Sequence, residues 1–149
     1  MEADFASVWS RVTGAPVEPP EALLRRFLKE AAEAQRALNA AAALTCDAVI
    51  RSKLTELQSA ACRRRKRLRA ALYLLTGERD CPAASECVCP CSLTAALRQL
   101  YQRAEQSAAA YTQAAKSADR ASLRSLYSEL SEERRKEADC LLRLTERLF

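Results

Sequence analysis

The chain has 149 residues and a net charge of +5, so it fits one domain with enough apolar content for a core. Alanine, leucine, arginine and glutamate dominate, and the scarcity of glycine and aromatic residues excludes a typical sheet protein. With no histidine and only two glycines, Ser/His/Asp and Cys/His catalysis and a glycine-rich phosphate loop are excluded as well.

Prolines and glycines separate the predicted helices of the first half. Residues 1–19 are predicted to form a short amphipathic helix, at about 4–13, followed by a linker. A long helix is expected at about residues 20–45, because two prolines mark its start. Asp47 is a suitable N-cap for the second long helix, and Gly77 is suited to end it.

The second half repeats the order of an alanine-rich helix and a helix with a charged centre. A cysteine-rich loop is expected at 78–92. Ser92 or Thr94 is expected to cap a third helix that runs to about Ser117, and Asp119 to cap the fourth.

This pattern predicts an all-α protein, a four-helix bundle over residues 20–149 built as a single domain from two antiparallel helical hairpins. The turns within each half are short, which favours hairpins, whereas the loop at 78–92 is too long for a tight turn and is expected to run along the bundle. The repeated order of helices indicates a duplicated hairpin.

Charged residues interrupt the apolar stripes of the second and fourth helices. The first stripe comprises Ile50, Leu54, Leu57, Ala61, Arg64, Leu68, Ala71 and Leu75. The second comprises Leu123, Tyr127, Leu130, Arg134, Glu137, Leu141, Leu144 and Leu148. A buried charge without a partner is very unfavourable, so these inward charges are expected to meet other groups.

Three segments carry a resemblance to a known family. The end of the second helix reads Leu68-Arg-Ala-Ala-Leu-Tyr-Leu-Leu-Thr-Gly-Glu-Arg79, the N-terminus reads Val8-Trp-Ser-Arg-Val12, and the fourth helix contains Glu129-Leu-Ser-Glu-Glu-Arg-Arg-Lys-Glu-Ala138. With these segments the chain resembles the ferritin-like superfamily, and specifically its rubrerythrin-type members. The resemblance implies a four-helix bundle in which each hairpin supplies a glutamate and an E-x-x-H pair to hold two irons.

The family's ligand positions are largely altered in this chain. They fall on Glu30 or Glu33, Ala61 and Arg64, the neighbourhood of Glu105, and Arg134 and Glu137. Both histidines are missing and two arginines lie where cations would bind, so the resemblance implies a degenerate di-iron site without the family's oxidoreductase or peroxidase activity.

Two interpretations of the inward arginines remain open. Arg64 and Arg134 could each bridge two of the carboxylates of Glu30, Glu33, Glu105 and Glu137, which would form a salt-bridged core. Alternatively, Arg64 could extend past the small Ala61 and reach water.

The cysteines of the long loop form the pattern C-x5-C-x-C-x-C, made by Cys81, Cys87, Cys89 and Cys91. Clustered thiols can bind zinc, copper or an iron–sulfur cluster, or exchange disulfides. The spacing differs from the C-x2-C pairs of zinc ribbons and of rubredoxin-like modules, so a surface loop with incidental cysteines is the competing interpretation.

The tyrosines and the basic run are expected to serve packing and solvation. Tyr73, Tyr101, Tyr111 and Tyr127 are predicted to lie in or beside the core. The basic run Arg63–Arg69 lies on a helix, so most of its charges are expected to form a solvated face. Without an aromatic platform or a recognition module, the pattern argues against nucleic-acid binding.

The sequence favours a non-catalytic structural or interaction protein, with an unidentified protein partner, a homodimer as one option, and no cofactor. The alternatives are a metal-binding or thiol-redox protein that uses the cysteine loop, with zinc, copper or iron, and an iron-dependent oxidoreductase that uses carboxylates only. No membrane span and no signal peptide are predicted, so a cytoplasmic location is expected, with thiols rather than a disulfide framework.

Overall fold

A computed structural model describes residues 18–79, 90 and 92–149, and over these residues the chain forms four helices and no strands. The helices are α2 (Pro20–Ala42), α3 (Ala48–Thr76), α4 (Leu93–Ser117) and α5 (Ala121–Glu146). The prediction of an all-α, four-helix fold is confirmed. The predicted N-terminal helix and the four loop cysteines lie outside the described residues. Within the described residues, no helix is both long and apolar enough to cross a membrane.

Three of the predicted helix ends are capped as expected. The Asp47 carboxylate accepts hydrogen bonds from the backbone N–H groups at the start of α3, at 2.9 Å from that of Val49. Gly77 ends α3 with a φ of 74°, the left-handed conformation that glycine adopts without steric strain. The Ser92 hydroxyl accepts a hydrogen bond of 3.2 Å from the N–H of Ala95 at the start of α4.

Two helix boundaries differ from the prediction. α2 ends at Ala42 rather than near residue 45, because Ala43 and Leu44 form a turn and residues 45–47 lie outside both helices. The predicted N-cap Asp119 is wrong: Arg120 occupies the cap position of α5 and its side chain makes no capping hydrogen bond. Instead, Arg124 donates hydrogen bonds of 3.0 Å to the carbonyl groups of Ala118 and Asp119.

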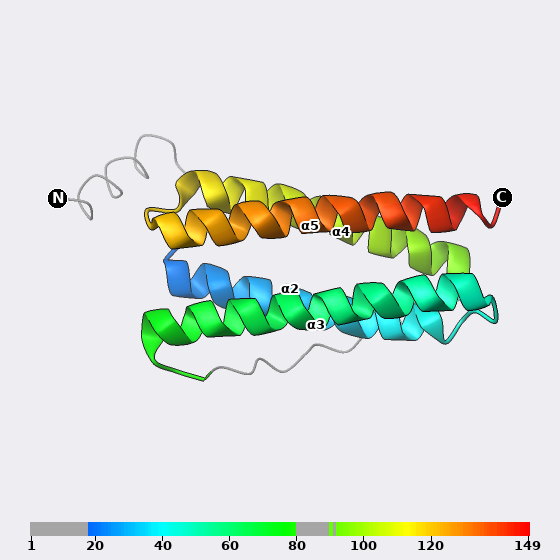
Figure 1. Ribbon diagram of the computed structural model, residues 1–149, viewed down its shortest axis with the longest axis horizontal. Coiled ribbons are helices and arrows are strands. Elements are labelled where there is room, and N and C mark those ends of the chain that lie inside the picture. Colours follow the sequence, from blue (N-terminus) through cyan, green and yellow to red (C-terminus); the bar gives the residue numbers. More distant parts are fainter. Residues whose placement is uncertain (1–17, 80–89, 91) are drawn as a thin grey trace.

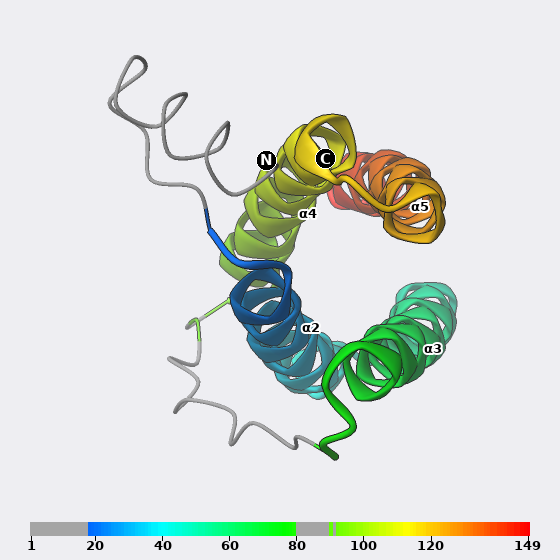
Figure 2. The same ribbon diagram turned by 90° about the vertical axis from the view of Figure 1, so that its left-hand side faces the viewer.

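The helices form two antiparallel hairpins, α2 with α3 and α4 with α5 (Figure 1). In that view α3 and α4 both run from right to left, so the end of α3 and the start of α4 lie at opposite ends of the bundle. Seen end-on, the helices follow one another around the bundle in the order α2, α3, α5, α4 (Figure 2). Each helix is therefore flanked by antiparallel neighbours.

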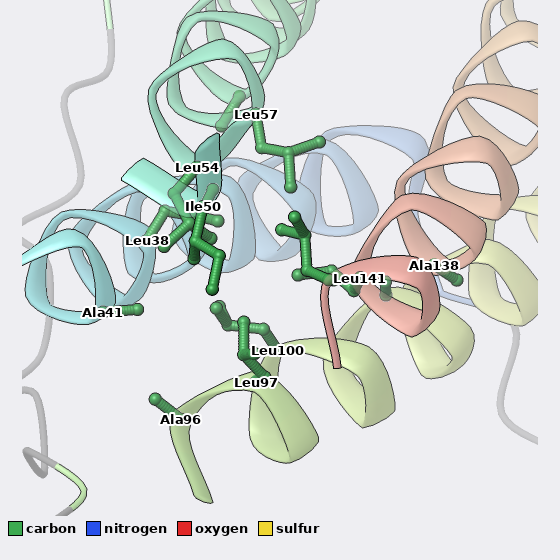
Figure 3. Close-up of a cluster of buried hydrophobic side chains, with 13 residues drawn as sticks. Leu38, Ala41, Ile50, Leu54, Leu57, Ala96, Leu97, Leu100, Ala138 and Leu141 are labelled. Carbon is green, nitrogen blue, oxygen red and sulfur yellow. The ribbon is translucent and has the colours of Figure 1, made fainter. Parts of the chain in front are cut away.

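Two apolar clusters fill the bundle, one toward each end. The first contains Leu38, Ala41, Ile50, Leu54, Leu57, Ala61, Ala96, Leu97, Leu100, Ala104, Ala138, Leu141 and Leu144. Figure 3 shows its side chains converging from all four helices. The second contains Leu24, Phe27, Leu28, Ala31, Leu68, Leu72, Tyr111, Ala114, Leu123, Tyr127 and Leu130.

The two predicted stripes agree with this core except at their ends. Near the end of α3 the fully buried residue is Leu72, while Ala71 and Leu75 are only partly buried. Leu148 is exposed, because α5 ends at Glu146 and the residues beyond it no longer follow the helical stripe.

Candidate functional site

Charged side chains lie between the two apolar clusters, in the middle of the bundle. On α3, Arg64 lies between Ala61 of one cluster and Leu68 of the other, and its exposure is 0%. On α5, Arg134 and Glu137 are also buried, at 3% and 5% exposure. We call Arg64, Arg134, Glu137 and their partners Glu30 and Ser107 the ion-pair layer.

Glu137 is the centre of this layer because two guanidinium groups share its carboxylate. Nη1 of Arg64 donates to Oε1 of Glu137 at 2.9 Å. Nη1 of Arg134 donates to Oε2 at 2.7 Å. Both oxygens of the buried carboxylate therefore receive charge-assisted hydrogen bonds, which are the strong kind.

Arg134 extends the layer to α2. Its Nη2 donates to Oε1 of Glu30 on α2 at 2.7 Å. The hydroxyl of Ser107 on α4 lies 3.4 Å from the other oxygen of Glu30 and donates to it. The layer thus connects all four helices, and its two arginines balance its two glutamates.

This geometry decides between the two interpretations of the inward arginines. The salt-bridged core is confirmed, because Arg134 bridges Glu137 and Glu30 and Arg64 pairs with Glu137. Escape of Arg64 past Ala61 to water is wrong, because both residues are fully buried. Arg64 pairs with one carboxylate rather than the expected two.

Two of the expected carboxylates lie outside the layer. Glu33 is partly buried and forms an ion pair of 3.6 Å with Arg103 on α4. Glu105 is exposed beside Tyr101, so the expectation that it points into the bundle is wrong. The inward residue of α4 at this level is Ser107, which lies one turn beyond the buried Ala104 and was missed because serine does not stand out in an alanine-rich helix.

The surroundings keep Arg64 charged. Burial acts to lower the pKa of Arg64, but the carboxylates of Glu137 and Glu30 outweigh it and raise that pKa above its ordinary value. On the adjoining part of α5, burial raises the pKa of the half-buried Glu133, although the positive charge of Arg64 opposes the shift.

An aromatic group adjoins the layer on the side of the second cluster. The ring centroids of Phe27 and Tyr111 are 4.3 Å apart, and those of Phe27 and Tyr127 are 5.5 Å apart. Burial raises the pKa of both tyrosines, to about 12 for Tyr127, so both hydroxyls are neutral at physiological pH. These two tyrosines are core residues as predicted, whereas Tyr73 is 49% exposed and that prediction is wrong.

The residues in the layer do not fit a di-iron centre. Both oxygens of Glu137 are engaged by guanidinium groups, and two positive charges occupy the interior. In the part of the chain that the structure describes, no cluster of three or more His, Cys, Asp and Glu side chains could hold a metal ion. The described cysteines, Cys46, Cys62 and Cys140, are free thiols.

The fold and site therefore define an all-α four-helix bundle with a buried, charge-balanced layer at its centre. Comparisons of the chain with protein-family models, with curated proteins and with solved structures find no match.

Proposed function

We propose that this protein is a non-catalytic bundle of ferritin-like, rubrerythrin-type descent, in which guanidinium groups have taken the place of metal ions. Its role is then structural, or lies in binding another protein. The observation that carries the proposal is the buried Glu137 carboxylate, which is held between Arg64 and Arg134.

The electrostatic argument compares a guanidinium with a metal ion. Inward carboxylates need positive charge to be buried, and either kind of cation supplies it. Once the arginines are in place, a divalent ion would meet two positive charges at short range in an interior of low dielectric constant. It would also have to displace hydrogen bonds of 2.7 to 2.9 Å from the carboxylate that would be its best ligand.

Because ion pairs engage the inward carboxylates, the proposed function lies on the outer surface of the bundle. The chain has no histidine to act as a general base, and its central carboxylates are committed to ion pairs. The bundle then serves to hold its outer helix faces in a fixed geometry.

The test is metal content and metal binding of the full chain. Protein purified under anaerobic, reducing conditions is analysed for metals and then titrated with Fe²⁺. We expect less than 0.1 equivalent of iron in the layer, on the order of background, because the guanidinium groups repel dications. Binding of about two irons per chain, lost in Glu30→Gln and Glu137→Gln variants, would overturn the proposal in favour of the carboxylate-only oxidoreductase.

One observation favours a second candidate, a metal-binding or thiol-redox function. Cys81, Cys87, Cys89 and Cys91 fall within eleven residues of the sequence. Such thiols suit zinc, copper(I) or iron–sulfur clusters. The same elemental analysis separates this candidate, because stoichiometric metal that is lost in Cys89→Ala but kept in Glu137→Gln would assign the metal to the loop.

A further inference from the structure

The outward face of α3 carries positive charge that the bundle does not use. The helix holds one acidic residue, Glu56, and eight basic ones: Arg51, Lys53, Arg63, Arg64, Arg65, Lys66, Arg67 and Arg69. Three members of the basic run have partners inside the protein. Arg64 pairs with Glu137, Arg65 donates to Gln35 at 2.7 Å, and Arg67 pairs with Glu129.

The remaining three members are Arg63, Lys66 and Arg69. All are exposed, and none forms an ion pair with another described residue of the chain. Their spacing of three residues places them along one side of the helix, over a length of roughly 9 Å. They therefore form a ridge of charge that faces away from the core.

Two exposed apolar side chains continue this face toward the end of α3. Tyr73 is 49% exposed and Leu74 is 85% exposed. Aromatic residues and arginine are enriched in protein interfaces, where an apolar anchor is commonly surrounded by polar contacts. We call Arg63, Lys66, Arg69, Tyr73 and Leu74 the α3 outer face.

We propose that the α3 outer face docks an acidic, amphipathic helix of another protein. This inference rests on the proposed interaction role and gives it a partner class. Carboxylates spaced three or four residues apart on the partner would lie opposite Arg63, Lys66 and Arg69. An apolar residue at one end of that ridge would cover Leu74 and Tyr73.

On another side of α3, its arginines already pair with carboxylates of a neighbouring helix. α5 presents Glu129 to Arg67 and Glu137 to Arg64, with the half-buried Glu133 between them in sequence. On the α3 outer face the charge of Arg63 also acts on Glu133, whereas Lys66 and Arg69 form no ion pair with another described residue. Charge complementarity therefore favours a second acidic helix there.

Other anionic partners explain the face less well. Nucleic acid would use the charges through its phosphates but would leave Leu74 in water. An anionic membrane would contact both the basic and the apolar side chains of the face, but two exposed apolar side chains provide little area for insertion into lipid.

The experiment measures binding of a synthetic helical peptide to the full chain by fluorescence anisotropy. The probe is an 18-residue peptide with glutamates at i, i+3 and i+7 on one face and leucines at one end of this acidic face. A control probe has glutamine in place of each glutamate. The Lys66→Glu/Arg69→Glu variant changes the ridge. Its matched control is Lys136→Glu/Arg143→Glu, which makes the same charge change on exposed positions of α5.

We expect the ridge variant to weaken binding of the acidic probe about tenfold or more, while the α5 control changes it less than about threefold. Leu74→Ser should also weaken it, by roughly threefold to tenfold, since an apolar anchor is lost. Circular dichroism of each variant should be unchanged, because all of these side chains are exposed.

Several results would overturn the inference. The acidic and control probes could bind with equal affinity, or the two charge variants could lose equal affinity for the acidic probe. Leu74→Ser could bind the acidic probe as tightly as the parent protein. At the same salt concentration, a dT20 oligonucleotide or phosphatidylserine vesicles could bind more tightly than the acidic probe. A dimer in sedimentation that the ridge variant dissociates would assign the face to a second copy instead. None of these results changes the metal content, so failure of this inference is distinct from failure of the proposed function.

Discussion

Glu137 accepts hydrogen bonds from the two buried guanidinium groups of Arg64 and Arg134, so its carboxylate compensates the positive charges of the interior. The layer contains no other fully buried carboxylate, since Glu30 keeps 25% of its side chain exposed. Loss of the Glu137 carboxylate would leave the fully buried Arg64, at 0% exposure, without an ion pair.

We expect Glu137→Gln to lower the free energy of unfolding by about 3–5 kcal/mol, because it leaves a buried arginine without an opposing charge. Urea unfolding followed by circular dichroism measures the change. Glu105→Gln is the matched control, since Glu105 is exposed, and it should stay within about 0.5 kcal/mol of the parent protein. Similar losses in the two variants would contradict a special role for the layer.

Glu133 makes the stability of the fold depend on pH, and the direction of its pKa shift sets the sign of that dependence. Burial raises its pKa above the ordinary value of 4.5, so the folded state binds this proton more tightly than the unfolded state. The contribution of Glu133 to the free energy of unfolding is therefore fully present below pH 4.5, where its carboxyl group is protonated in both states. This contribution is lost as the pH rises through the folded-state pKa.

We expect Glu133→Gln to reduce the loss of stability between pH 4 and pH 7, because glutamine stays neutral throughout. Urea midpoints across this range give the measurement, with the exposed neighbour Glu132→Gln as control. If Glu133→Gln instead proved less stable than the parent at pH 7, the attraction between Glu133 and Arg64 would outweigh desolvation.

At the scale of the elements, the helix starts are unequal. α3 and α4 begin with side-chain caps from Asp47 and Ser92, whereas Arg120 offers no acceptor to α5. The backbone of Arg120 is already extended, with φ −86° and ψ 130°, which suits a capping residue.

We expect Arg120→Ser to raise the free energy of unfolding by roughly 0.5–1 kcal/mol, because its hydroxyl can accept a hydrogen bond from a free N–H in the first turn of α5. Thermal or urea unfolding measures the gain. Arg120→Ala removes the same charge without adding an acceptor, so a gain of equal size in that variant would mean that the charge, not the cap, is responsible.

At the scale of the whole molecule, the ion-pair layer connects the two hairpins. Arg64 on α3 meets Glu137 on α5, and Arg134 on α5 meets Glu30 on α2. Apolar packing is tolerant of small shifts, whereas hydrogen-bonded ion pairs are directional. The hypothesis is that the layer sets the register of one hairpin against the other.

Replacing Arg64, Arg134 and Glu137 together with methionine tests this hypothesis. We expect equal or higher stability in urea, since apolar groups of similar volume commonly match a buried ion pair, but a loss of conformational uniqueness. Peak doubling or broadening in a ¹⁵N–¹H NMR spectrum would show that loss. A single sharp set of peaks would remove the register role, and a large drop in stability would mean that the ion pairs themselves stabilise the fold.

Much of the fold follows from local features of the sequence. Helical periodicity, the acceptor of Asp47 and the left-handed conformation of Gly77 depend on residues close in the chain, so the four helices and most of their ends were predictable. The same periodicity placed Arg64, Arg134 and Glu137 on inward faces, and all three are buried there.

The sequence by itself therefore determined which charges enter the core, whereas the tertiary structure decided which groups they meet. In alanine-rich α2 and α4, many registers bury similar small side chains, and local pattern does not choose among them. Glu105 and Ser107 are two positions apart, which is about 200° around a helix, so a small error in register exchanges an exposed carboxylate for an inward hydroxyl. Only the packing of four helices against one another removes that ambiguity, because it fixes the rotation of each helix about its axis.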